Sequence, residues 1–216
     1  MKRENQRNIL IALCILSAFV LWTVLIKTVD VKAIGPQGSA VGFATINQFF
    51  HSLTGVHMVL YEITDWLGLI PIIVVVVFAG IGLTQLVKRK NLGKVDFSIL
   101  LLGGFYIVVM AVYLFFESYV VNYRPVLIDG ILEASYPSST TMLAMCVMPT
   151  AAMQLNERMN NIVLKRYINL IITVFTLFMI IGRLISGVHW FTDIVGGALL
   201  SGGLVMMYYA VRRLKQ

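Results

Sequence analysis

Long apolar runs separated by short polar segments dominate this chain. Six of the runs approach the ~20 residues that a helix needs to cross a bilayer. They span residues 9–26, 67–87, 97–116, 141–155, 167–181 and 192–211. No hydrophilic stretch of domain size separates them. The pattern therefore predicts an all-α integral membrane protein, with one membrane domain over residues 1–216 built as a six-transmembrane helix bundle.

Composition agrees with this interpretation and argues against nucleic acid as a partner. Hydrophobic residues make up 59% of the chain and charged residues only 12%, and the mean hydropathy is +0.87. These values lie outside the range of soluble globular proteins. The net charge of +7 could indicate nucleic acid, but the basic residues are dispersed among the connecting segments. We therefore expect a membrane environment and no nucleic-acid partner.

The basic residues also predict an orientation, because cytoplasmic loops of membrane proteins are enriched in Lys and Arg. If the N- and C-termini are cytoplasmic, the inner segments contain most of the 17 basic residues. These are Lys2, Arg3, Arg7, Lys88, Arg89, Lys90, Lys94, Arg158, Lys165, Arg166, Arg212, Arg213 and Lys215. The outer segments then contain only Lys27, Lys32, Arg124 and Arg183. Trp190 and Tyr123 fall at the outer boundary, where we interpret them as membrane-interface aromatics.

The longest outer segment, residues 29–66, becomes amphipathic in its second half. Ile46, Phe49 and Leu53 recur at helical spacing, with polar residues on other faces. This favours an interfacial helix on the outer leaflet, broken at Gly55. A lid that helps a lipid head group reach the site is the alternative.

The clearest chemical signal lies in residues 182–197, GRLISGVHWFTDIVGG. If the chain is helical from Val188, His189 and Asp193 stand at i and i+4 and share one face. The carboxylate can then accept the Nδ1 proton of the imidazole and leave Nε2 free as a nucleophile. A helix N-terminus favours an anion, and the planar fork of Arg183 suits two phosphate oxygens. The stretch predicts phosphoryl chemistry.

Two earlier stretches extend this signal. Arg124 precedes Pro125 in NYRP, and Ser138 and Ser139 follow Pro137 in YPSST. In this order, with the later R-x5-H-x3-D pattern, the chain resembles the type 2 phosphatidic acid phosphatase / haloperoxidase superfamily, in its membrane branch. The scheme of six spans places all three motifs on the same outer face.

The resemblance implies a metal-independent reaction without a cofactor. His189 would attack phosphorus and form a phosphohistidine, and Asp193 would orient the imidazole. The residues implied to bind the substrate phosphate are Arg124, Arg183, Ser138 and Ser139. From the residues alone, no His/Cys cluster at ligand spacing predicts a metal site either.

Two positions depart from the family pattern. Glu117 stands where the first motif begins with lysine, and Thr140 where the middle motif ends in the histidine that protonates the leaving oxygen. A positioned general acid contributes ~10²–10⁴-fold in rate, and its loss should harm a lipid alkoxide more than a phosphate leaving group. A diphosphate such as an isoprenoid pyrophosphate is therefore the favoured substrate.

Other outer-face residues could replace the missing acid. They are Glu117, Glu133, His51 and His57. Glu117 has a second interpretation, in which it recognises a cationic head group such as choline or ethanolamine.

The sequence thus predicts a membrane lipid or isoprenoid (pyro)phosphate phosphatase in a bacterial plasma membrane, with its active site facing outside and a phosphorylated lipid as substrate. One alternative is a lipid phosphotransferase, which would pass the phosphoryl group to an alcohol instead of water. The other is a catalytically degenerate member that binds phospholipid. The intact pair of His189 and Asp193 favours an enzyme, whereas Thr140 and Glu117 favour the degenerate alternative.

Overall fold

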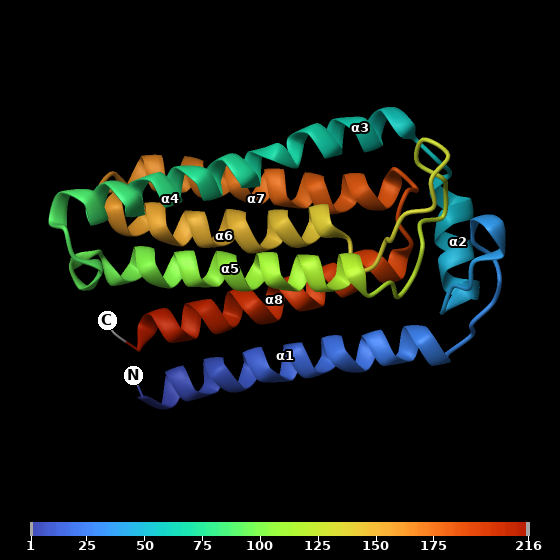
Figure 1. Ribbon diagram of the computed structural model, residues 1–216, viewed down its shortest axis with the longest axis horizontal. Coiled ribbons are helices and arrows are strands. Elements are labelled where there is room, and N and C mark those ends of the chain that lie inside the picture. The colour runs from blue at the N-terminus through green and yellow to red at the C-terminus, as the bar shows by residue number, and fades with distance from the viewer. Residues whose placement is uncertain (1, 215–216) are drawn as a thin grey trace.

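The computed structural model describes residues 2–214 as a bundle of helices (Figure 1). The helices are α1 (Lys2–Thr28), α2 (Ala44–Thr54), α3 (Met58–Leu67), α4 (Leu69–Arg89), α5 (Phe97–Ser118), α6 (Ser139–Arg158), α7 (Ile162–Ile185) and α8 (Phe191–Arg213), with short 3₁₀ turns at Pro36–Gly38 and Leu92–Lys94. Across the described residues, extended pairing is limited to isolated bridges in the loops. The prediction of an all-α protein is confirmed.

The six long helices α1 and α4–α8 run along the longest axis of the molecule (Figure 1). Both chain ends lie at one end of the bundle, together with the α4–α5 and α6–α7 connections. At the opposite end, α2 lies across the bundle and the loop 119–138 passes beside it. The two ends therefore differ: one holds short connections and the other holds the longer loops.

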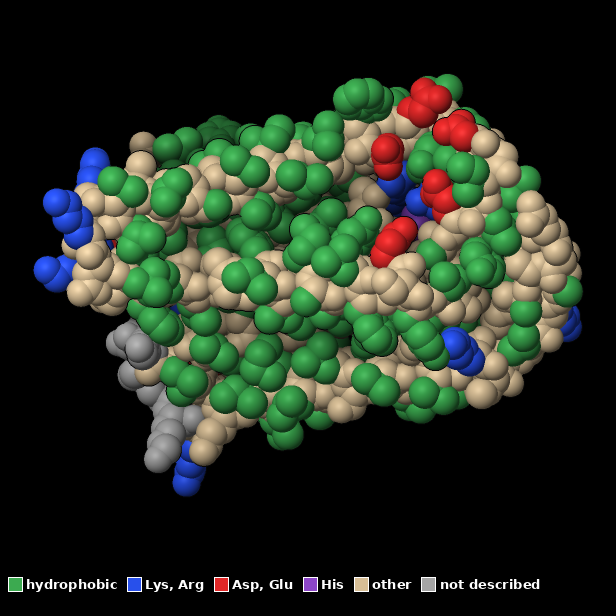
Figure 2. Space-filling view, in the orientation of Figure 1, with side chains coloured by type: hydrophobic (Ala, Val, Ile, Leu, Met, Phe, Trp, Pro, Cys, Tyr) green, Lys and Arg blue, Asp and Glu red, His purple; other side chains and the backbone are tan. Residues whose placement is uncertain are grey.

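The outer faces of the bundle are apolar, as Figure 2 shows for one side. Exposed aliphatic side chains such as Val20, Leu21 and Ile107 cover these faces. Five helical segments are long and apolar enough to cross a membrane, namely Arg3–Thr28, Met58–Arg89, Phe97–Ser118, Ile162–Ile185 and Phe191–Arg213. Since such surfaces are stable only in an apolar solvent, the protein is an integral membrane protein.

The expected fourth span, residues 141–155, corresponds to α6, which is less apolar than the other long helices. It contacts α4, α5, α7 and α8, so its neighbours are protein rather than lipid. Its polar side chains find partners there: the Thr150 hydroxyl lies 3.3 Å from the Tyr106 hydroxyl of α5, and Gln154 donates to the Tyr208 hydroxyl of α8 at 2.6 Å. Burial by protein explains why this helix tolerates polar residues. Six crossings stay a prediction.

The amphipathic segment is broken where its pattern suggested, but its second half does not lie at the membrane interface beside the first. Its helix is broken at Gly55, which has a φ of 67°. Beyond the break, α3 prolongs α4 through Gly68 instead of lying flat beside α2 (Figure 1). The backbone N–H of His57 donates to the Ser186 carbonyl at 2.9 Å. This bond ties the α2–α3 linker to the segment that carries the motif histidine.

Candidate active site

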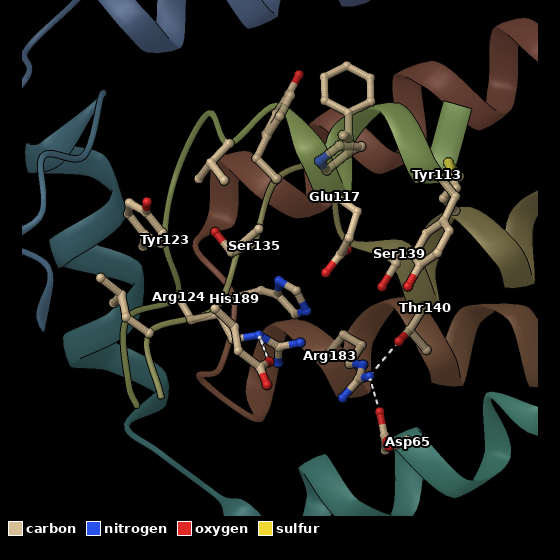
Figure 3. A pocket seen from close by; sticks show the side chains of 18 residues that line it. Asp65, Tyr113, Glu117, Tyr123, Arg124, Ser135, Ser139, Thr140, Arg183 and His189 are labelled. Carbon is tan, nitrogen blue, oxygen red and sulfur yellow. Dashed lines mark hydrogen bonds and ion pairs between the residues drawn. The ribbon is translucent and has the colours of Figure 1, made fainter. Parts of the chain in front are cut away.

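A cavity of about 530 Å³ lies at the end of the bundle opposite the termini, where Figure 2 shows a hollow and Figure 3 shows the side chains that line it. Side chains from α3, α5, α6 and α7 and from the loop 119–138 line it. We call Arg124, Arg183 and His189 the floor of the cavity, and Asp65, Glu117 and Glu133 its rim. Figure 2 shows acidic side chains around a hollow in which basic and histidine side chains are visible.

His189 lies in the short loop between α7 and α8 and is 4% exposed. The helix begins at Phe191 rather than at Val188, so the expectation that His189 is itself helical is wrong. The i, i+4 spacing still brings the two side chains together, with His189 Nδ1 at 3.8 Å from Asp193 Oδ2. That separation exceeds a hydrogen bond, although such contacts often tighten when substrate binds.

Asp193 is fixed by its position in the first turn of α8. Its Oδ2 accepts the backbone N–H of Trp190 at 2.9 Å, which is a helix-capping arrangement. Its Oδ1 accepts from Asn122 Nδ2 at 3.3 Å. The carboxylate is fully buried, so its direction toward His189 is set by these two donors.

The start of α8 is held in place by α2. Asn47 is fully buried, and its amide donates to Thr192 Oγ1 at 3.0 Å while its oxygen accepts the Thr192 N–H at 3.2 Å. In the loop between α7 and α8, Gly187 has a φ of 70°, and a Cβ at this position would overlap the Gly55 carbonyl oxygen. Sequence reasoning placed Asn47 on a polar face and missed this role, for which no local signal exists.

Arg183 projects from the last turn of α7 and is 1% exposed. Its Nη2 donates to Asp65 Oδ1 at 2.7 Å and also contacts Thr140 Oγ1 (Figure 3). Its guanidinium lies over the Tyr61 ring at 4.9 Å, and its Nε is buried without a hydrogen-bond partner in the part of the chain that the structure describes. Asp65 and Tyr61 both come from α3, and the sequence analysis assigned neither to the site.

Arg124 lies in the loop 119–138, where Tyr123 and Ala134 form an isolated bridge. Its backbone N–H donates to the Glu133 carbonyl at 3.0 Å, and its Nε lies 3.1 Å from Glu133 Oε2. Its Nη1 is buried and has no hydrogen-bond partner. Tyr61 also lies beneath this guanidinium, at 5.6 Å. The two arginines thus converge on one aromatic ring, each with an unused donor.

The two serines have different positions. Ser139 lines the cavity at the start of α6. Ser138 is fully buried outside the lining, and its backbone N–H donates to the Asp193 carbonyl at 3.1 Å. A hydroxyl from Ser138 to the phosphate, as the resemblance implied, is therefore not available in this arrangement.

The two departures from the motif pattern both line the cavity. Thr140 contacts the Arg183 guanidinium through its hydroxyl oxygen, so this oxygen is already engaged. Glu117 lies in the last turn of α5, is exposed, and points into the cavity (Figure 3). Among the residues that the structure describes, it forms no ion pair.

The other candidate acids and aromatics are placed differently from expectation. Glu133 lines the cavity, but His51 and His57 do not. His51 packs against the Trp190 ring at 5.5 Å. Trp190 is 3% exposed and donates its indole N–H to the Tyr123 carbonyl at 2.8 Å. The interpretation of Trp190 as a membrane-interface residue is wrong, because it is a buried support of the floor.

Burial controls the protonation state of the floor. It lowers the pKa of His189 to about 4, and the nearby Arg124 and Arg183 charges act in the same direction. The imidazole is therefore neutral at pH 7, with a lone pair available for attack. Its Nε2 is buried without a hydrogen-bond partner in the described part of the chain.

The sequence profile of the PAP2 superfamily matches residues 99–216, more than half of the chain. The chain belongs to the PAP2 superfamily. The crystal structure of the first transmembrane PAP2 type phosphatidylglycerolphosphate phosphatase from Bacillus subtilis is similar in fold, with a TM-score of 0.62 at 18% sequence identity. The similarity covers 94% of this chain and 96% of that one. No curated protein matches the chain in sequence.

Membership in the PAP2 superfamily confirms the resemblance stated from the motifs and supports a phosphatase-type hydrolase. The matched range contains all three motifs and all the cavity-lining residues except Asp65. Asp65 and Tyr61 lie before it, in the part of the chain that the profile does not match.

Proposed function

We propose that this PAP2 protein removes a phosphoryl group from a membrane lipid or isoprenoid (pyro)phosphate, using His189 as the nucleophile. The supporting observation is the state of the floor. His189 Nε2, Arg124 Nη1 and Arg183 Nε are all buried and belong to side chains that line one cavity, and none has a hydrogen-bond partner among residues 2–214. Unsatisfied buried groups are costly, so their convergence indicates a ligand that satisfies them. A phosphoryl group accepts from both arginines and receives the lone pair of His189.

The reaction proceeds in two balanced steps. In the first, the Nε2–P bond forms, the bond from phosphorus to the leaving oxygen breaks, and its electron pair goes to that oxygen. Asp193 stabilises the imidazolium character that develops on His189. In the second, a water oxygen attacks phosphorus, and the N–P bond breaks with its electron pair returning to His189 Nε2. One water proton stays on the attacking oxygen, the other passes to a phosphoryl oxygen, and inorganic phosphate is released.

The leaving oxygen is the unsolved part of the first step. Thr140 Oγ1 engages Arg183, and a threonine hydroxyl is far too weak an acid to replace histidine. A leaving phosphate needs no full protonation, whereas a lipid alkoxide does. On this ground alone, turnover of an isoprenoid diphosphate should exceed that of the matching monophosphate.

The site faces the outer side in this proposal. The basic connections Lys88–Lys94 and Asn156–Arg166 lie at the end with the chain termini, and Figure 2 shows basic side chains gathered there. By the positive-inside rule that end is cytoplasmic, and the cavity lies at the other. Six crossings and cytoplasmic termini follow from the same scheme.

Phosphate release by the purified protein in detergent tests the proposal. The substrates are an isoprenoid pyrophosphate, the isoprenoid monophosphate and phosphatidic acid. His189→Ala should lose about 10⁴-fold or more in kcat, as removal of a catalytic nucleophile does. His57→Ala is the matched control, since His57 lies outside the cavity lining and binds the Thr54 carbonyl.

Two further outcomes separate the alternatives. A phosphohistidine detected by mass spectrometry at alkaline pH, which releases no inorganic phosphate and passes its phosphoryl group to an added alcohol as a phosphate ester, identifies a phosphotransferase. Substrate binding without any phosphoenzyme identifies the degenerate binder, which the contact between Thr140 and Arg183 favours. Release that is equal in wild type and His189→Ala contradicts the proposed nucleophile.

A further inference from the structure

We propose that the substrate of this site carries an ammonium group close to its phosphate, and that Glu117 and Glu133 bind this cation. The inference rests on the proposed function and deepens it by naming a class of substrate, a zwitterionic phosphate ester. It concerns recognition, and on this ground it favours a cationic lipid phosphate over an isoprenoid diphosphate, which has no ammonium group. The leaving-group argument concerns only the rate of the chemical step.

The first ground is the charge that lines the cavity. Arg183 is paired with Asp65 at 2.7 Å, and Arg124 with Glu133 at 3.1 Å. Glu117 adds a third carboxylate with no cationic partner in the described part of the chain, and His189 is neutral at pH 7. Two positive groups therefore face three negative ones. A phosphate dianion alone would increase the negative excess, whereas a ligand that brings its own cation would offset it.

The second ground is the separation of the two signs. The floor is buried, with side-chain exposures of 2% for Arg183 and 11% for Arg124. The rim is open, with 39% for Glu133 and 59% for Asp65. The unpartnered donors of the floor fix the phosphate at the bottom of the cavity. A positive group attached to that phosphate then lies beside the carboxylates of Glu117 and Glu133 at the mouth.

The third ground is the remaining wall of the cavity. Tyr113, Phe116 and Tyr123 line it together with the carboxylates. Aromatic faces combined with carboxylates are the surroundings that bind ammonium groups in proteins. The volume of about 530 Å³ lies in the range of sites for ligands much larger than a phosphate ion. It leaves room for a charged head group beyond the phosphoryl oxygens.

This arrangement gives a reason for Glu117 at the position where the family motif has lysine: the carboxylate selects substrates that carry an ammonium group. A lysine there would strengthen binding of any phosphate and repel an ammonium group. A carboxylate weakens binding of every phosphate that lacks a cation. Specificity gained by rejecting competitors in this way is a common use of charge in binding sites.

Binding of matched ligand pairs by the His189→Ala protein in detergent tests the inference without turnover. In the first pair, 2-aminohexadecyl phosphate carries the cation on the leaving alcohol, and its N-acetyl derivative has a neutral amide in place of the ammonium group. In the second pair, phosphatidylethanolamine carries the cation on the transferred group, and phosphatidylpropanol has an uncharged head group of similar size. We expect a preference of about tenfold for the cationic member of one pair, the size of a partly desolvated charge contact.

Glu117→Gln and Glu133→Gln, each added to His189→Ala, should reduce this preference to about twofold or less. Glu62→Gln is the control, because Glu62 is an exposed carboxylate on α3 outside the cavity lining. Helical circular dichroism and thermal unfolding verify that each variant is folded.

The outcomes distinguish the inference from the proposed function. Equal affinity within both pairs overturns the inference, even if the wild type releases phosphate through His189. A preference that survives in both rim variants overturns the assignment to these carboxylates. A preference that is lost in them supports the inference, even if His189 proves not to be the nucleophile.

Discussion

The floor and the rim of the cavity differ in how the protein holds them. The floor residues Arg183 and His189 are 1% and 4% exposed. Arg183 lies in the last turn of α7 and His189 lies just before α8, where backbone hydrogen bonds hold the chain. Rim residues such as Asp65 and Glu117 are exposed and come from α3 and α5. A buried group cannot change without disturbing its neighbours, whereas an exposed one can. In the proposed function, the floor therefore carries the chemistry, and the rim can be adjusted to the substrate.

The largest effect should follow from removing a floor cation. Arg183→Gln removes a charged donor from the phosphate, and we expect kcat/KM to fall by about 10²–10³-fold, as it does when a transition-state donor is lost. Arg166→Gln, an exposed arginine at the far end of the bundle, should leave the rate unchanged. A loss below tenfold for Arg183→Gln would contradict its place in the floor. Steady-state phosphate release measures both.

A substitution at Thr140, which contacts the floor residue Arg183, should raise turnover instead of lowering it. Thr140→His restores a proton donor, so turnover of a lipid monophosphate should rise by about 10²-fold. An isoprenoid diphosphate should gain far less, because its leaving phosphate needs no acid. An equal gain on both substrates would mean that the histidine acts on binding rather than on the leaving group.

The hydrogen bonds from Asn47 to Thr192, which hold the start of α8, should contribute to the stability of the fold. Asn47→Ala leaves the Thr192 N–H and hydroxyl without their buried partner, and we expect a loss of about 1–3 kcal/mol in the free energy of unfolding. Ser52→Ala, on the exposed side of α2, is the control. Titration with denaturant in detergent measures the difference. Equal stability of the two variants would show that α2 does not hold α8.

The pH profile should separate the floor from the rim. Burial lowers the pKa of His189 to about 4, so kcat/KM should stay high at pH 5.5, where an ordinary histidine is ~90% protonated. Because the folded-state pKa lies below the unfolded value of 6.5, protonation opposes folding, and stability falls as the pH drops from 6.5 to 4. His189→Gln should remove this part of the slope. Glu117→Gln should leave the acid limb of kcat/KM near pH 4, and a shift would implicate the rim.

The smallest effect should come from the rim partner of Arg183. Asp65 is more than half exposed, so its ion pair is screened by water, and Asp65→Asn should change KM by only about two- to fivefold. The kcat should stay within twofold. A loss of kcat/KM as large as that of Arg183→Gln would show that Asp65 matters as much for the reaction as the floor residues do, which contradicts the distinction between floor and rim.

The motifs and the apolar runs, which are local features of the sequence, were enough to predict much of this architecture. A chain that crosses a bilayer must satisfy its backbone within helices, so the runs alone predicted an all-α membrane protein. The spacing of His189 and Asp193 predicted their proximity, because four residues bring two side chains to one face near a helix start. The order of the RP, PSS and R-x5-H-x3-D motifs indicated the family that the profile match confirms.

Only the tertiary structure decided which polar residues join the site from outside the motifs. Asp65 reaches Arg183 because α3 packs on α7, and Asn47 is buried because α2 lies across the start of α8. A polar residue on an amphipathic helix has the same local signature whether it faces water or a partner far along the chain. Trp190 shows the converse, since an aromatic residue at a membrane boundary proved to be buried. Contacts between segments far apart in sequence fixed these positions, and no local pattern records them.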